Sequence, residues 1–251
     1  MDDIELLKKR FTELANKSYN AGIYLFTDFL GLAEQAVFSE AKSAFRAIPY
    51  TAFGGASGAE RVMVRFGDEE SCGYSADFPI VCIKAEPVSP KFADKLTHRD
   101  FLGALLNLGI ERSTLGDIPI HDNVGYIFAK EDIAPFIISE LKRVKHTDVT
   151  LSLADSLPEG ELYKTERRKI QVSSERVDAV IAKTFSLSRE AAQSLFAKRL
   201  VYIDGRLCES VSYTPKKNEK ISVRGYGRII YLGYETTSKK GKLNAQVELY
   251  V

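Results

Sequence analysis

The first 46 residues carry a helical pattern of hydrophobic positions. Apolar residues recur every three or four positions, which places their side chains on one face of a helix. These residues are Ile4, Leu7, Phe11 and Leu14 in the first segment and Ala33, Ala36, Val37 and Ala41 in the second. Thr27 can cap a turn that begins at Asp28. Residues 49–60 contain three Gly and one Pro, so they are predicted to form a loop and a domain boundary.

Residues 61–155 change to short apolar runs that alternate with helical segments. Residues 61–66 and 80–85 are typical of strands, and residues 95–110 of a helix that Thr97 caps. Two short strands around a His-Asp-Asn turn, a second helix and a last strand follow. From about residue 79 to residue 153 the order is strand–helix–strand–strand–helix–strand. This order predicts a ferredoxin-like βαββαβ domain, the arrangement of the RNA-recognition motif.

The C-terminal third begins after a polar segment that contains Pro and Gly. We expect a linker at residues 156–172 and a separate domain at residues 173–251. Two short helices, a strand and a turn at Asp204-Gly205 are predicted there, with a later strand in "EKISVRG". Ser188 is suited to cap the second helix, but Arg189 lies in its first turn, where the helix dipole disfavours a cation. The chain is therefore predicted to be an α/β (α+β) protein with a helical region at 1–60, a ferredoxin-like domain at 61–155 and this third domain.

Charge is unevenly distributed along the chain. The net charge of all 251 residues is +1, but residues 1–175 carry −6 and residues 176–251 carry +7. Lys and Arg concentrated at one end of a chain indicate a polyanionic partner. A solvated surface with a chance excess of cations would give the same numbers, so charge alone leaves both interpretations open.

The few cysteine and histidine residues form no recognisable metal or catalytic pattern. Cys72, Cys82 and Cys208 make no CxxC pair. His98 and Asp100 are two positions apart in a predicted helix, so they lie on different faces and do not form a dyad. The N-terminus lacks an apolar signal segment, and no stretch reaches the ~20 apolar residues of a membrane span. We expect a cytoplasmic protein without membrane association, metal, cofactor or small-molecule substrate.

The C-terminal residues resemble the S-four domain, a small RNA-binding module named after the fourth small-subunit ribosomal protein. The matching positions are Arg176-x-Asp178, Val180-Ile181-Ala182, Phe185-x-Leu187-Ser188-Arg189, Ala191-Ala192, Leu195, Val201-x-Ile203-Asp204-Gly205 and Ile221-x-Val223. Many positions at fixed spacing are a more specific signal than a lone short motif. The resemblance implies an S-four domain over residues 173–251 whose two helices and hairpin face structured RNA.

This resemblance also implies which side chains contact RNA. The candidates on the helices are Arg176, Ser188, Arg189, Gln193, Lys198 and Arg199. In the hairpin and the later "RGYGR" loop they are Tyr202, Arg206, Arg224, Tyr226 and Arg228. Arg and Lys neutralise phosphates, and Arg makes bidentate contacts that Lys cannot. Tyr202 either packs or stacks on RNA, and the "RGYGR" loop is either a phosphate contact or a tight glycine turn with an exposed Tyr.

The rest of the chain resembles the YlmH family of bacterial S-four proteins. The segments that carry this resemblance are "FTDFL", "FGGASGAER", "LTHRDFLGALLNLGIERSTLGDI" and "RGYGRIIYLG". The family is encoded near cell-division genes and has no established catalytic activity. Related small S-four proteins of the heat-shock type bind stalled large ribosomal subunits that carry peptidyl-tRNA. The resemblance therefore implies binding to rRNA or tRNA on the ribosome, with the large subunit favoured, in rescue or quality control.

Five residues elsewhere are weaker candidates for contact with RNA or the ribosome. Tyr126 and Phe128 share one face of the third strand of the βαββαβ unit, where RNA-recognition motifs place stacking aromatics. Val124 replaces the basic residue of that signature, so a buried aromatic pair is the favoured interpretation. The other three candidates are Arg99, Lys239 and Lys240, the last two in an expected hairpin loop.

Two other classes of function stay open. S-four domains are often joined to RNA-modifying enzymes such as pseudouridine synthases and methyltransferases. Here Gly205-Arg206-Leu207 is followed by Cys208 instead of the Asp that a pseudouridine synthase needs, and the glycine-rich first turn of a methyltransferase sheet is not found. The third class is a cell-division adaptor in which RNA binding is incidental. We favour an RNA-binding protein without enzymatic activity.

Overall fold

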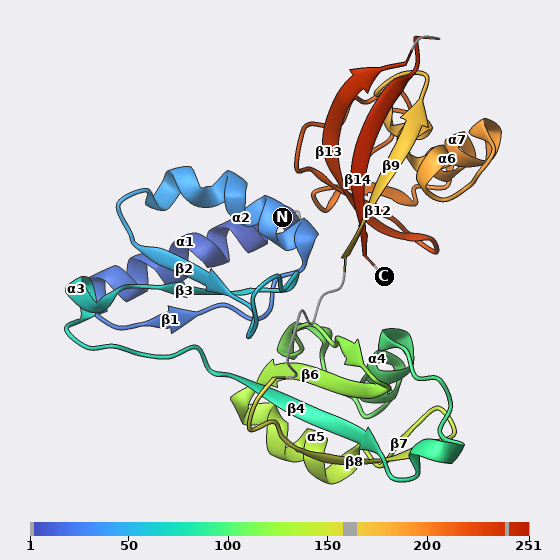
Figure 1. Ribbon diagram of the computed structural model, residues 1–251. Helices are drawn as coiled ribbons and strands as arrows, with labels where there is room; N and C mark the ends of the chain where they lie inside the picture. Colours follow the sequence, from blue (N-terminus) through green and yellow to red (C-terminus); the bar gives the residue numbers. More distant parts are fainter. Residues whose placement is uncertain (1–2, 158–164, 239–240, 251) are drawn as a thin grey trace. The chain divides into compact units, whose positions relative to one another are not determined.

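The computed structural model describes residues 3–157, 165–238 and 241–250 (Figure 1). The chain forms two compact units, Met1–Leu162 and Tyr163–Val251. In both units helices pack on antiparallel sheets, which confirms the α+β class predicted from the sequence. Within the described residues, no helix combines the length and the apolar composition that crossing a bilayer requires.

The N-terminal part of the first unit is a pair of helices on a three-stranded sheet. The helices are α1 (Asp3–Ala21) and α2 (Leu32–Ala41), and the strand order is β1 (Leu25–Phe26), β3 (Met63–Phe66), β2 (Tyr50–Phe53). The short helices η1 (Lys42–Phe45) and α3 (Glu69–Cys72) complete this part. Its core is aromatic: the Phe38 ring lies edge-on to Phe11 at 5.2 Å and tilted to Phe45 at 5.6 Å. Such offset and edge-on arrangements are the favoured geometries of aromatic pairs.

This sheet corrects the predicted boundary near residue 60. Residues 49–60 are not a loop throughout, because residues 50–53 pair with β3. The strand β3, which the sequence assigned to the middle domain, is the central strand of the N-terminal sheet. Strand pairing depends on partners distant in sequence, and the glycine content of 49–60 concealed one of them.

Thr27 was expected to cap a helical turn at Asp28, and the structure assigns it another role. Its hydroxyl donates to the carbonyl of Asp28 at 2.7 Å and accepts from the amide of Val64 at 2.9 Å. It therefore fixes the chain beside β3. The helix α2 begins at Leu32, and the Glu34 side chain caps it by accepting a hydrogen bond from the amide of Gly31 at 2.6 Å.

The middle part of the first unit has the predicted βαββαβ order. Its elements are β4 (Ile80–Pro87), η2 (Pro90–Phe92), α4 (His98–Asn107), η3 (Arg112–Thr114), β5 (Ile120–His121), β6 (Val124–Lys130), η4 (Glu131–Ile133), α5 (Ala134–Glu140), β7 (Arg143–Val144) and β8 (Thr147–Leu153). The sheet order is β5-β6-β4-β8-β7, and neighbouring strands are antiparallel. The strand β4, which comes first in the βαββαβ unit, therefore lies between β6 and β8, its third and fourth strands. This is the ferredoxin-like arrangement, extended by β7. Thr97 caps α4 reciprocally with Asp100, as the sequence predicts.

The two faces of the middle sheet are covered by different parts of the chain. The helices α4 and α5 pack on one face, over residues such as Ile83 and Ile127. On the other face, Gly55 lies so close to the Phe128 ring that a Cβ on Gly55 would overlap it. Gly55 also has a φ of +94°, a conformation that glycine adopts without steric cost. The glycine-rich loop after β2 is therefore shaped for packing against β6.

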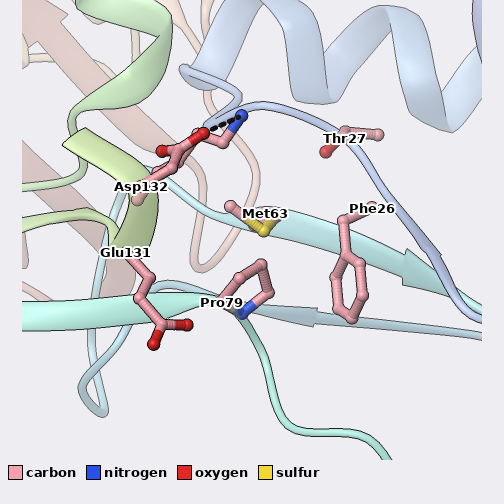
Figure 2. A pocket seen from close by; sticks show the side chains of 7 residues that line it. Phe26, Thr27, Met63, Pro79, Glu131 and Asp132 are labelled. Atoms are coloured by element: carbon pink, nitrogen blue, oxygen red, sulfur yellow. Dashed lines mark ion pairs between the residues drawn. The ribbon is translucent and has the colours of Figure 1, made fainter.

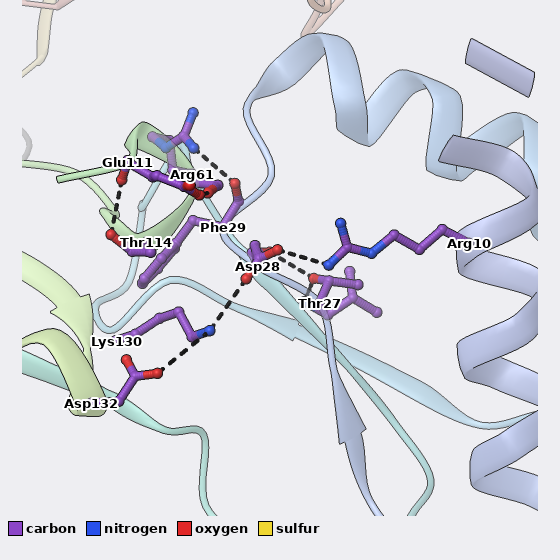
Figure 3. Close-up of polar contacts among 11 residues, drawn as sticks. Arg10, Thr27, Asp28, Phe29, Arg61, Glu111, Thr114, Lys130 and Asp132 are labelled. Carbon is purple, nitrogen blue, oxygen red and sulfur yellow. Dashed lines mark hydrogen bonds and ion pairs between the residues drawn. The ribbon is translucent and has the colours of Figure 1, made fainter. Parts of the chain in front are cut away.

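Hydrogen bonds join the N-terminal and middle parts (Figure 3). The guanidinium of Arg61 donates to the carbonyl of Phe29 at 2.7 Å and to that of Leu115 at 2.9 Å. The carboxylate of Asp117 accepts from the amides of Glu60 at 2.6 Å and Arg61 at 3.2 Å. Three of the segments that resemble YlmH sequences, residues 26–30, 53–61 and 96–118, meet at this junction. These segments therefore supply contacts that join the two parts of the first unit.

The second unit packs two helices on a six-stranded antiparallel sheet. Its strand order is β11 (Arg206–Leu207), β10 (Val201–Ile203), β12 (Lys220–Val223), β13 (Gly227–Thr237), β14 (Leu243–Tyr250), β9 (Thr165–Val172). The helices α6 (Val177–Thr184) and α7 (Arg189–Ala197) form its core with the sheet, around Val180, Leu195 and Ile229. The predicted helices and the turn at Asp204-Gly205 are confirmed.

Half of the expected linker is part of this sheet. Residues 165–172 form β9, which pairs with β14 along its whole length. Residues 158–164 of the expected linker lie outside the described residues. Polar composition concealed the strand, because an edge strand with one solvated face needs few apolar residues.

Candidate nucleic-acid interface

Asp178, at the start of α6, is the centre of a polar cluster. Its carboxylate has no exposed surface. Arg176 donates to it through Nε and Nη2, each at 3.1 Å, and Arg189 through Nε at 3.1 Å and Nη2 at 3.4 Å. The Nε2 group of Gln193 adds a hydrogen bond of 2.9 Å. Three side chains predicted to face RNA are therefore held by one carboxylate.

Asp178 keeps its negative charge in spite of its burial. Burial by itself would raise the pKa of the carboxyl group, because it penalises the charged form. Hydrogen bonds from Gln193, Arg176 and Arg189, with the charge of Arg189, outweigh this effect and hold the pKa below its usual value. At neutral pH the cluster of two guanidinium groups and one carboxylate has a net charge of +1.

The position of Arg189 is explained by this cluster. A cation in the first turn of α7 opposes the helix dipole, and the S-four resemblance implies that Arg189 contacts RNA. The structure places the carboxylate of Asp178 against it. The side chains of Arg176 and Arg189 nevertheless keep 37% and 44% of their surface exposed. Both therefore hold an internal ion pair and still present part of the guanidinium to solvent.

The C-terminal end of α7 presents two further cations, Lys198 and Arg199. Both side chains are exposed. Arg199 lies 3.5 Å from Glu209, but both partners are more than two-thirds exposed, so the pair contributes little. Ser188, at the other end of α7, accepts a hydrogen bond from the amide of Ala191 at 3.0 Å. Its oxygen serves as the helix cap, and the side chain is exposed.

The outer face of the C-terminal sheet carries two arginine–tyrosine stacks. The guanidinium of Arg224 lies 4.5 Å from the centre of the Tyr202 ring, and that of Arg228 lies 5.2 Å from the centre of the Tyr250 ring. Tyr202 is opposite Ser222 and Ser222 is opposite Arg228, so these side chains form one row across the strands. The neighbours of Tyr202 point into the core, and alternation therefore turns the row outward. Tyr250 had no distinguishing signal in the sequence.

The "RGYGR" loop is a tight glycine turn with an exposed tyrosine. Gly225 and Gly227 have φ angles of +88° and +144°, and the amide of Tyr226 donates to the carbonyl of Val223 at 3.0 Å. The Tyr226 side chain is 48% exposed, with its ring centre 5.9 Å from that of Phe185. Tyr226 is therefore near the end of α6, apart from the row of Tyr202. Arg206 is exposed in β11, next to the hairpin turn.

The weaker candidates for RNA contact differ in their exposure to solvent. Tyr126 is 6% exposed and Phe128 is 1% exposed, so neither ring presents a stacking face, and the favoured interpretation of a buried pair is confirmed. Arg99 is exposed in the first turn of α4. Lys239 and Lys240 lie outside the described residues.

A pocket in the first unit brings charged groups together, and its lysine is held in ion pairs (Figure 2). It measures about 440 Å³ and is lined by Phe26, Thr27, Met63, Pro79, Lys130, Glu131 and Asp132. The Lys130 ammonium lies 3.2 Å from Asp28 and 3.9 Å from Asp132. Asp28 also pairs with Arg10 at 2.9 Å (Figure 3). No group of three potential metal ligands occurs in the part of the chain that the structure describes.

A ferredoxin-like domain followed by a unit with cationic helix ends and arginine–tyrosine stacks is typical of RNA-binding proteins. Residues 74–156 match the family described as the putative RNA-binding domain in YlmH. Over 229 residues, 88% of this chain and 86% of the relative, the sequence is 29% identical to the ribosome-associated protein quality control protein P2 of Bacillus subtilis (strain 168). The matched family and this relative support the resemblance to the YlmH family that the sequence motifs indicated.

Among solved structures, the chain is similar to the cell division protein YlmH from Streptococcus pneumoniae, with a TM-score of 0.49 and 20% identity, over 61% of this chain and 92% of that one. The assignment of residues 173–251 to an S-four domain stays a prediction.

Proposed function

We propose that this protein binds structured rRNA or tRNA on the ribosome through its C-terminal unit, without chemistry of its own. The observation that carries the proposal is the pair of exposed cations at the end of α7, Lys198 and Arg199. The same helix contributes Arg189 and Gln193 to the Asp178 cluster. The name of the Bacillus subtilis relative supports a ribosomal partner. The description of the matched family supports RNA.

The Asp178 cluster would contribute by orientation. Two guanidinium groups held by a buried carboxylate lose little further freedom when they meet a phosphate. Their exposed edges present N–H donors in the fixed geometry that suits phosphate oxygens. Lys198 and Arg199 add charge that raises affinity at low salt.

The outer row of the C-terminal sheet would contribute by stacking. A tyrosine ring covered by a guanidinium group is a flat surface on which an unpaired base can lie. The cationic helix ends and this row suit an RNA that presents both a phosphate backbone and unpaired bases, as loops of rRNA and tRNA do. The specific partner in this proposal is the large ribosomal subunit that carries peptidyl-tRNA, and the process is quality control or rescue of translation.

The two alternative classes make different predictions. An RNA-modifying enzyme would change nucleosides, which mass spectrometry of RNA incubated with the protein detects. The residue after Gly205-Arg206-Leu207 is Cys208, whose buried thiol donates a hydrogen bond to the Ser210 carbonyl, so this hairpin lacks the carboxylate that a pseudouridine synthase needs there. A cell-division adaptor would still bind its protein partner after the cationic residues of the C-terminal unit are substituted.

The test is the binding of the full chain to purified large ribosomal subunits and to fluorescently labelled tRNA over a range of salt concentrations. Lys198→Glu with Arg199→Glu should weaken binding at least tenfold near physiological salt. The slope of log affinity against log salt should fall by roughly 1.5, about 0.7 to 0.9 for each lost phosphate contact.

The matched control is Lys216→Glu with Lys217→Glu, two exposed cations on the same unit but away from α7. It changes the net charge equally and should bind within about twofold of the wild-type protein. Equal losses in both variants would mean that only overall charge matters, and no loss in either would overturn the proposal.

A further inference from the structure

The middle domain matches an RNA-binding family, yet the aromatic residues on the usual RNA-binding face of its βαββαβ sheet are buried. RNA-recognition motifs stack bases on aromatic residues of the sheet. Here Phe128, on the central part of that face, is 1% exposed, and Gly55 covers its ring. A base therefore cannot stack on this ring, and an RNA contact of this domain needs another basis.

A groove on the helical side of the middle domain has the required chemistry. It measures about 620 Å³ and lies between α4 and the segment that joins α5 to β8. Its charged lining residues are Arg99, Asp100, Glu140, Lys142, Arg143 and Lys145. The matched segment as a whole is acidic, with nine Lys+Arg and twelve Asp+Glu in residues 74–156. Four of those nine cations line this one groove, so the charge is concentrated there.

The groove cations are largely available for a ligand. Arg99, Lys142 and Lys145 are exposed, and among the described residues none has a carboxylate within ion-pair distance. Arg143 lies 3.4 Å from Asp148, but this pair is 63% and 71% exposed and therefore weak.

The carboxylates of the groove do not cancel this charge. The carboxylate of Asp100 accepts hydrogen bonds from the amide and the hydroxyl of Thr97, at 2.8 and 2.7 Å. The pKa of Asp100 is lowered, first by the hydrogen bond from Thr97, and the charge of Lys145 adds to the effect. Four cations thus face two carboxylates, one of which serves as a helix cap.

We propose that this groove is a second RNA contact, in which Arg99, Lys142, Arg143 and Lys145 hold a phosphate backbone. The proposal rests on the function proposed above and adds a separate surface to it. Exposed Lys and Arg side chains on two facing walls suit the regularly spaced phosphates of a strand, and the contact would be independent of base sequence.

The first test is lysine labelling of the full chain with an amine-reactive acetylating reagent, with and without purified large ribosomal subunits. Lys142 and Lys145 should become protected, while Lys91 and Lys95, exposed on the same domain but outside the groove, keep their reactivity. The same experiment with protein-free rRNA from those subunits separates RNA from a ribosomal protein. Protection by whole subunits alone would assign the groove to a protein partner and overturn the proposal.

The second test is the charge reversal Arg99→Glu with Lys142→Glu. Glutamate is favourable in the first turn of α4, so this variant should fold. We expect a loss of affinity of fivefold or more and a salt slope reduced by about 0.7 to 0.9 per lost contact. The control, Lys91→Glu with Lys95→Glu, should bind like the wild type.

The outcomes distinguish the two proposals. If the groove variant binds like its control while the Lys198 and Arg199 variant loses affinity, the groove inference is wrong and the proposed function stands. If the wild-type chain binds neither subunits nor rRNA, the proposed function fails, and the groove inference fails with it.

Discussion

Asp178 and Arg189 are joined by two hydrogen bonds, from Nε to Oδ2 at 3.1 Å and from Nη2 to Oδ1 at 3.4 Å. The carboxylate is fully buried, and the guanidinium is partly exposed. One partner therefore belongs to the interior of the second unit and the other to its surface. This link makes the position of a surface cation depend on a group that is buried from solvent.

Removal of the charge on Asp178 should destabilise the second unit. Asp178→Asn leaves Arg176 and Arg189 without their counterion, and the expected cost is about 1–3 kcal/mol, less than for a fully buried pair because water reaches both guanidinium groups. Hydrogen exchange of the α6 amides in the full chain measures this cost for the second unit alone. Glu209→Gln, which breaks only an exposed pair, should change exchange by less than about 0.5 kcal/mol. Equal effects of both substitutions would contradict a structural role for the buried carboxylate.

The same carboxylate predicts how stability depends on pH. The pKa of Asp178 is lower in the folded chain than its usual value of 3.8. The stabilisation is therefore fully present above that value and is lost as pH falls through the folded-state pKa. The difference in stability between the wild type and Asp178→Asn should shrink on acidification below about pH 4. Urea unfolding at several pH values measures it, and a difference that stays constant down to pH 2 would show that this carboxyl group does not titrate as stated.

Substitutions of Arg189 should separate its two roles. Arg189→Gln keeps a donor for Asp178 but removes the cation, so RNA affinity should fall severalfold and the salt slope by about 0.7 to 0.9. Arg189→Glu brings a second carboxylate to Asp178, so it should also destabilise the unit. Salt-dependent tRNA binding and α6 hydrogen exchange report the two effects separately. Unchanged binding by Arg189→Gln would mean that Arg189 serves only the internal pair.

The Tyr202 ring should matter more than its hydroxyl. If a base stacks on this row, Tyr202→Ala should cost about 1–3 kcal/mol of binding, roughly fivefold to 150-fold in affinity. Tyr202→Phe keeps the ring under Arg224 and should bind within about twofold of the wild type. The measurement is the affinity for a tRNA probe with unpaired loop bases. Equal affinity of both variants would exclude stacking at this position.

Alanine substitutions at two glycines of the first unit should change its stability in opposite directions. Gly55→Ala forces a Cβ against Phe128 at a φ of +94°, so it should destabilise the unit by about 1–3 kcal/mol. Gly103 lies within α4 with no atom within 4 Å of an added Cβ, so Gly103→Ala should stabilise by about 0.5–1 kcal/mol. Hydrogen exchange of the β6 and α4 amides measures both. A neutral Gly55→Ala would show that the loop does not cover β6 in solution.

The sequence by itself determined the elements that depend on near neighbours. Thr97 with Asp100 and Ser188 with the Ala191 amide cap helices within three residues, and the sequence located both caps. The βαββαβ order and the hairpin turn at Asp204-Gly205 follow from hydrophobic period and turn chemistry, which are also local.

Only the tertiary structure decided which partners those elements bring together. Asp178 meets Arg189 and Gln193, 11 and 15 positions away, because α6 and α7 pack side by side. Gly55 reaches Phe128, and β9 pairs with β14, across much longer stretches of chain. Burial and strand pairing arise from contacts between distant segments, and a one-dimensional pattern of polar and apolar residues does not specify them. For this reason the cationic end of the chain was evident in the sequence, whereas the buried carboxylate that orients its arginines was not.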